Sequence, residues 1–308
     1  MRPREIGELQ RLKTLLESGD LFNELPGLAE AGAVESFALQ LIDSRRRVEF
    51  VSTISKREIC KDRLNPHSQY FDPIRASISH LRDGNVDEAC WLVFLATHFG
   101  HNAKSKWRLT RDVYGALGAK KWTWNEVTSD LAGFRNWLAG AEATLRGGDG
   151  IRRAFGNHRK YTSLDAWKPN ATGDAIASYV DWIQQNGGHQ AMLADALTES
   201  LGDPGAAFDR LYSSMAQVAS FGRIGRFDYL TMLGKTGIAP ISPPSPYFKS
   251  ATGPLSGAKL LFGPGKSVGD YETETVILGN TLGFGMQIME DAICNWQKSP
   301  TRFKPFRG

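Results

Sequence analysis

Residues 85–100 read Asn85-Val-Asp-Glu-Ala-Cys-Trp-Leu-Val-Phe-Leu-Ala-Thr-His-Phe-Gly100, an apolar run between a helix-start signal and a helix-stop signal. Asn85 is a favourable N-cap residue, and Glu88 follows it three residues later, as in a capping box. Gly100 is typical of the residue at which a helix ends. The pattern predicts one helix that ends at Phe99.

Helical spacing recurs on both sides of this segment. Asp203 precedes Pro204 as a cap residue before a proline at the first helical position, and apolar residues follow at three- and four-residue spacing from 208 to 219. Similar patterns are found at residues 6–17, 29–43, 173–186 and 189–201. Alternating strand patterns are scarce, and no GxGxxG motif follows a strand. We therefore predict a mostly α protein.

The composition narrows the class of protein. Of the 308 residues, 41% are hydrophobic and 23% are charged, which excludes a disordered chain, a collagen-like fibre and a disulfide-stapled mini-protein. No apolar run reaches 18 residues, so no membrane span is expected, and the first residues lack the apolar core of a secretory signal. The three cysteines, Cys60, Cys90 and Cys294, are far apart. This usage suits a reducing cytoplasm and predicts no structural zinc site.

A glycine-rich segment is the clearest candidate linker. Gly147-Gly148-Asp149-Gly150 separates two stretches of helical pattern. We expect an N-terminal helical region over residues 1–147 and a C-terminal one over residues 151–308, either as two regions or as one intertwined domain.

Positive charge is concentrated in clusters. Residues 45–63 carry seven Lys and Arg against three acids, residues 101–121 carry six against one, and no acid follows Asp291. Aromatic residues lie among these clusters, a pattern that suits phosphate contacts and base stacking in a nucleic-acid groove. Solvated helix faces are the alternative. The candidate DNA contacts in these clusters are Arg45, Arg46, Arg47, Lys298 and Arg302.

Residues 229–269 contain no Asp or Glu but four lysines. Within them, Thr252-Gly-Pro254 predicts a helix start, Leu255–Phe262 the helix, and Gly263-Pro-Gly265 its end. A helix N-terminus without nearby carboxylates favours an anion. We predict a phosphate site that includes Gly253, Ser256, Gly257 and Lys259; a proline-rich surface loop with a short capped helix is the alternative.

The segment Phe221-Gly-Arg-Ile-Gly-Arg-Phe-Asp-Tyr229 lies between two helical patterns and looks like the hairpin of a helix-hairpin-helix element. The candidate DNA contacts here are Gly222, Arg223, Gly225 and Arg226. The two glycines are three residues apart, whereas the usual hairpin spaces them two apart. Phe227 stands where the bifunctional DNA glycosylases of that fold carry a nucleophilic lysine, which excludes Schiff-base lyase chemistry from this position.

Three carboxylates are candidates for catalysis: Asp228, Glu290 and Asp291. Helical spacing places Asp291 and Asn295 on one face, where a carboxylate beside an amide could position water or stabilise a sugar cation. A solvated terminal helix is the alternative. His98 is a further candidate to face substrate, and a structural role at a helix end is its alternative. His98 and His101 lack a third ligand, so no metal site is predicted.

Six separated motifs together resemble the α-glutamyl/putrescinyl thymine pyrophosphorylase family, specifically its third clade, over roughly residues 40–300. They are Ile42-Asp-Ser-Arg-Arg-Arg47, Tyr70-Phe-Asp-Pro-Ile74, Gly84-Asn-Val-Asp-Glu-Ala89 with Val93-Phe-Leu-Ala-Thr-His-Phe-Gly100, Lys121-Trp-Thr-Trp124, Gly253-Pro-Leu-Ser-Gly-Ala258 and Glu290-Asp-Ala-Ile-Cys294. Asn295 follows the last motif, where other members carry a glutamate.

The resemblance implies a fold similar to that of helix-hairpin-helix DNA glycosylases and chemistry on DNA bases. Two functions follow from it. One is a monofunctional N-glycosylase that removes a hypermodified phage base, such as glucosylated hydroxymethylcytosine, in antiphage defence; the other is a transferase in which an amino acid or polyamine displaces pyrophosphate from a pyrophosphorylated hydroxymethyl base. A DNA-binding module without catalysis, for which the basic clusters suffice, is a third hypothesis. Asn295 counts against the transferase more than against DNA binding. We expect phage DNA as the partner, no membrane association and no cofactor.

Overall fold

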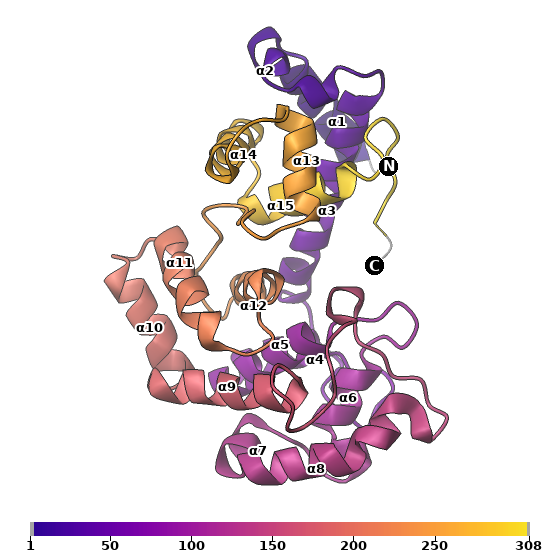
Figure 1. The fold of residues 1–308 in the computed structure, drawn as a ribbon, viewed down its shortest axis with the longest axis vertical. Helices are drawn as coiled ribbons and strands as arrows, with labels where there is room; N and C mark the ends of the chain where they lie inside the picture. The colour runs from indigo at the N-terminus through magenta and orange to yellow at the C-terminus, as the bar shows by residue number, and fades with distance from the viewer. Residues whose placement is uncertain (1–2, 307–308) are drawn as a thin grey trace. The chain divides into compact units, whose positions relative to one another are not determined.

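A computed structural model describes residues 3–306, and these residues form helices and connecting loops without a β-strand (Figure 1). The only pairing of strand type in this range is an isolated bridge between Asn102 and Lys106. The prediction of a mostly α protein is confirmed. No helix in the described range is long and apolar enough to cross a bilayer.

The chain forms two compact units. Unit 1 combines the N-terminal residues up to Val51 with the C-terminal segment from Ser242, and unit 2 consists of Ser52–Ile241. Residues 147–150 lie inside unit 2, where Arg153 donates two hydrogen bonds of 2.8 Å to Asp149. The division therefore differs from the one expected at residues 147–151, because helices from both ends of the chain share one core.

The described part of unit 1 is built from seven helical segments. They are α1 (Pro3–Leu16), α2 (Gly19–Asn23), η1 (Pro26–Leu28), α3 (Ala33–Ile54, whose last turn belongs to unit 2), α13 (Gly253–Phe262), α14 (Val268–Leu282) and α15 (Met286–Trp296). The core of unit 1 joins both ends of the chain: the ring of Trp296 packs edge-on against Phe37 at 5.3 Å.

Unit 2 surrounds the most apolar helix of the chain, α5 (Val86–Phe99). The other helices are α4 (Pro73–Arg82), α6 (Arg108–Tyr114), α7 (Trp124–Ser129), α8 (Leu131–Ala143), α9 (Thr172–Gln185), α10 (His189–Glu199), α11 (Pro204–Ser214) and α12 (Arg223–Thr236). Helices α4, α6, α7, α10 and α12 all pack on α5. The ring of Phe94 stacks on Tyr179 at 3.8 Å and on Phe221 at 4.8 Å, which fixes α5 in an aromatic core.

The predicted helix signals act as expected, with one exception. The side chain of Asn85 accepts a hydrogen bond from the Glu88 amide at 3.2 Å, and Asp203 caps α11 in the same way. Glu88 does not complete a capping box, because its carboxylate is buried and accepts hydrogen bonds from the Tyr114 hydroxyl (2.6 Å) and the Trp124 amide (2.7 Å). Burial raises the pKa of Glu88, so this carboxyl serves the core of unit 2.

Candidate nucleic-acid interface

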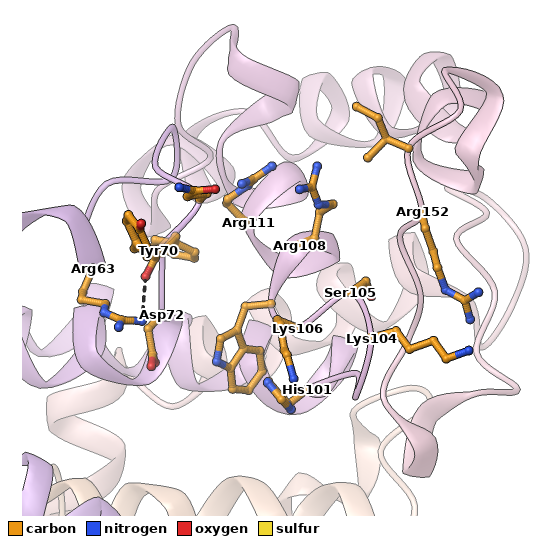
Figure 2. A pocket seen from close by; sticks show the side chains of 14 residues that line it. Arg63, Tyr70, Asp72, His101, Lys104, Ser105, Lys106, Arg108, Arg111 and Arg152 are labelled. Carbon is orange, nitrogen blue, oxygen red and sulfur yellow. Dashed lines mark hydrogen bonds between the residues drawn. The ribbon is translucent and has the colours of Figure 1, made fainter.

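Unit 2 contains a cavity of about 640 Å³, here called the basic pocket. Its lining comes from the loop at residues 63–72, from residues 101–111 and from residues 151–152 (Figure 2). Six cationic side chains line it: Arg63, Lys104, Lys106, Arg108, Arg111 and Arg152. Asp72 is the one carboxylate among the residues that line it.

Most of this positive charge is not neutralised within unit 2. Asp72 is already engaged, because it caps α4 through the Ile74 and Arg75 amides (3.1 Å each) and pairs with the Arg75 side chain. Arg111 pairs with Asp112 at 2.8 Å. The side chains of Lys104, Lys106, Arg108 and Arg152 form no ion pair with any described residue. A pocket with several unpaired cations attracts a polyanion.

The loop that carries the lysines is held in one conformation. The side-chain oxygen (Oδ1) of Asn102 accepts hydrogen bonds from the Lys104 and Ser105 amides (2.9 and 3.0 Å), and its side-chain nitrogen (Nδ2) donates to the Phe155 carbonyl at 3.0 Å. Lys106 adopts a left-handed φ of 53°, which costs energy for a residue with a Cβ and is fixed here by the backbone bridge to Asn102. The backbone that carries Lys104 and Lys106 is therefore held in place by contacts within unit 2.

Aromatic side chains lie among these cations. Tyr70 is 53% exposed and its carbonyl accepts a hydrogen bond from Arg63 at 3.2 Å (Figure 2). Trp107 packs edge-on against His101 at 5.0 Å. Cations for phosphates beside aromatic rings for bases are the combination found in nucleic-acid binding sites. The basic pocket can thus bind and position a nucleic acid, whereas its one carboxylate, Asp72, is not free for acid–base chemistry.

The three consecutive arginines of α3 are predicted DNA contacts, and the structure places all of them in ion pairs within unit 1. Arg45 pairs with Glu8 at 2.9 Å and Arg46 with Glu5 at 2.8 Å. Arg47 bonds to Asp43 and to Asp291. The sequence could not reveal this neutralisation, because Glu5, Glu8 and Asp291 belong to other helices.

The C-terminal candidates are brought together as expected from their spacing on α15. The side-chain nitrogen (Nδ2) of Asn295 donates to the Asp291 carboxylate at 3.0 Å, and the Lys298 ammonium donates to the side-chain oxygen (Oδ1) of Asn295 at 2.9 Å. The Arg47 guanidinium also pairs with the Asp291 carboxylate, at 2.5 Å. Glu290 lies on the same helix, and Arg302 is exposed after it. Asp291 and Asn295 are thus engaged with each other.

Helix α13 begins and ends where the sequence predicts, but its glycines serve helix packing. A Cβ on Gly257 would lie 2.5 Å from the Ile293 carbonyl oxygen of α15, and one on Gly253 would lie 2.8 Å from the Cys294 sulfur. Close approach to α15 thus accounts for both glycines. Ser256 and Lys259 are exposed.

The hairpin expected at residues 221–229 is wrong in its conformation, because α12 already begins at Arg223. Gly222 is its N-cap with an ordinary φ of −66°, and Gly225 lies inside the helix, where the Arg159 guanidinium occupies the space of a Cβ. Arg223 is 9% exposed, and Arg226 donates to the Tyr212 carbonyl at 3.0 Å. Both arginines are held within unit 2.

Asp228 and His98 both lie in unit 2, in different surroundings. Asp228 is half-buried on α12. Burial lowers the pKa of the Arg159 guanidinium, and the negative charge of Asp228 acts in the opposite direction by raising it. His98 is fully buried, and the rings of Phe94 and Phe221 lie nearly parallel to its imidazole, with centres at 6.0 and 6.1 Å. Its Nε2 lies 3.1 Å from the Thr172 hydroxyl, which donates to a carbonyl and so accepts from His98. A neutral His98 in the core does not face a substrate.

We expect a pH dependence of stability from this histidine. Burial, and then the Arg159 charge, lower the pKa of His98 from 6.5 to about 3. The contribution of neutral His98 to the stability of the fold is present above pH 6.5 and is lost as the pH falls toward 3. The reason is that His98 binds a proton at a higher pH in the unfolded chain than in the folded one. Between pH 6.5 and 5 this amounts to about 2 kcal/mol. Urea titrations at both pH values should show a smaller loss in His98→Leu, and equal losses in the two proteins would contradict the assignment.

A chain of polar contacts that runs from half-exposed Asp87 into the core carries no signal in the sequence. Asp87 lies 2.7 Å from His189, whose other ring nitrogen lies 2.8 Å from the Tyr179 hydroxyl, and this hydroxyl lies 2.8 Å from that of Tyr229. Arg152, which lines the basic pocket, is not among the DNA contacts that the sequence predicts. The signal for it is the absence of acids over residues 150–164, which carry four arginines and lysines.

A comparison with protein families matches residues 32–308 to the family described as alpha-glutamyl/putrescinyl thymine pyrophosphorylase clade 3. No curated protein and no solved structure matches the chain. The match extends over both units and includes every segment that lines the basic pocket. The chain therefore belongs to the third clade of the alpha-glutamyl/putrescinyl thymine pyrophosphorylase family.

Proposed function

We propose that this member of a family acting on modified DNA bases is a monofunctional DNA N-glycosylase. It excises a hypermodified phage base, such as glucosylated hydroxymethylcytosine, leaves an abasic site and acts in antiphage defence. The observation that carries the proposal is the basic pocket, with unpaired cations beside Tyr70 and Trp107. An enzyme that takes a base out of the helix must hold the backbone around it, and such a pocket suits this task.

The reaction breaks the bond between the sugar C1′ and the base nitrogen. The electron pair of that bond leaves with the base, and the sugar becomes a cation. A water molecule then adds its hydroxyl to C1′, and its proton goes to the departing base. A nearby carboxylate stabilises the sugar cation and orients the water.

We assign this carboxylate to Asp228. It lies in the same unit as the basic pocket, and it is half-buried beside the guanidinium of Arg159. Asp291, in contrast, is bonded to Arg47 and Asn295. Glu290 on α15 is the second choice.

A transferase that displaces pyrophosphate from a hydroxymethyl base is the second candidate function. The same unpaired cations of the basic pocket would hold pyrophosphate. Asn295, which stands where the resemblance to the family implies a glutamate, weighs against it.

Both functions are tested on phage DNA. The purified protein is incubated with unmodified DNA and with glucosyl-hydroxymethylcytosine DNA, and abasic sites are revealed by alkaline cleavage. We expect breaks in the modified DNA alone. A second reaction contains DNA with a pyrophosphorylated hydroxymethyl base and an amine. Release of pyrophosphate there, with no breaks in the first reaction, would replace the glycosylase by the transferase.

A further inference from the structure

Residues 150–164 form a basic segment that starts at the basic pocket. Ile151 and Arg152 line the pocket, and no acid occurs until Asp165. The segment runs beside the end of α5: the Gly156 amide donates to the Phe99 carbonyl at 2.7 Å, and a Cβ on Gly156 would lie 2.9 Å from the Gly100 Cα. Its path over the surface of unit 2 is therefore fixed.

Two of its arginines point inward and anchor it. The side chain of Arg153 is 3% exposed and pairs with Asp112 at 2.6 Å. Arg159 is 8% exposed and donates to the carbonyls of Thr97 (3.1 Å) and Ser220 (3.0 Å). These anchors hold the intervening residues against the core.

Three side chains next to the anchors are exposed. Arg152 and Lys160 are exposed, and Tyr161 is 91% exposed, two residues after the Arg159 anchor. The Lys160 ammonium lies 5.0 Å from the centre of the Tyr161 ring. An aromatic ring that is almost wholly in water, on an anchored segment without acids, is placed to stack on a ligand ring.

We propose that this segment binds single-stranded DNA, with an unpaired base stacked on Tyr161 and backbone phosphates beside Lys160 and Arg152. The proposal rests on the proposed function, since DNA is the ligand. Stacking on an aromatic side chain requires a base whose face is free, which a continuous duplex does not offer. The segment thus selects unpaired nucleotides next to the basic pocket.

The test measures the affinity of the full chain for a fluorescent 15-nucleotide single strand and for the corresponding duplex, by anisotropy. Tyr161→Ala is expected to weaken single-strand binding about 5- to 150-fold and duplex binding less than about twofold. Tyr161→Phe keeps the ring and should keep the affinity. Leu201→Ala removes another side chain of unit 2 that is 97% exposed and serves as the matched control.

Two results would overturn the proposal: wild-type single-strand affinity in Tyr161→Ala, or an equal loss for both DNA forms. If the wild-type protein releases a base from DNA and Tyr161→Ala binds normally, only the stacking role fails. If the wild-type protein binds neither DNA, the proposed function fails as well.

Discussion

Replacing Asp228 by asparagine is expected to slow base release about 100- to 1,000-fold, the usual cost of losing an electrostatic contact made in the transition state. The amide keeps the size of the side chain but loses the charge that stabilises the sugar cation. DNA affinity should change less than about twofold, because Asp228 does not line the basic pocket. The measurement is the rate of abasic-site formation on modified DNA under single-turnover conditions.

Two further variants serve as a control and as a test of the second candidate carboxylate. Asp181→Asn removes an exposed carboxylate from α9 of the same unit and should leave the rate unchanged. Glu290→Gln tests the second candidate on α15. Full activity in Asp228→Asn together with a large loss in Glu290→Gln would move the catalytic assignment to unit 1, and full activity in both would refute it for either carboxylate.

Gly257→Ala should destabilise unit 1 by about 1–3 kcal/mol, the range for forcing an extra carbon into a packed interface. The new Cβ would lie 2.5 Å from the Ile293 carbonyl oxygen and 2.6 Å from a side-chain carbon of Ile293. Since the first of these is a backbone atom, α13 and α15 have to move apart. Urea unfolding followed by circular dichroism measures the loss.

Gly7→Ala is the matched control for this substitution. Gly7 lies in α1 of the same unit, and a Cβ there would meet nothing within 4 Å. Alanine should therefore stabilise α1 by up to about 1 kcal/mol through its higher helix propensity. A Gly257→Ala protein as stable as the wild type would show that the packing of α13 on α15 yields easily.

The spacing of apolar residues and the capping residues predicted the helices, because both signals act between residues that are close in the sequence. The caps at Asn85 and Asp203, and the end of a helix at Gly100, depend on groups within four residues along the chain. The sequence misjudged residues 221–229, where glycines suggested a turn. In the structure Gly225 stays helical, and the space above it holds the side chain of Arg159, far away in sequence.

The sequence by itself determined an α-helical protein of this family with two strongly basic clusters, around residues 45–63 and 101–121. Only the tertiary structure decided which of these cations keep their charge available. Arg45, Arg46 and Arg47 are paired with acids from other parts of unit 1, whereas the lysines at 104 and 106 open on a cavity that also receives Arg152. Ion pairing depends on distances in space between residues far apart in the chain, which no local pattern encodes.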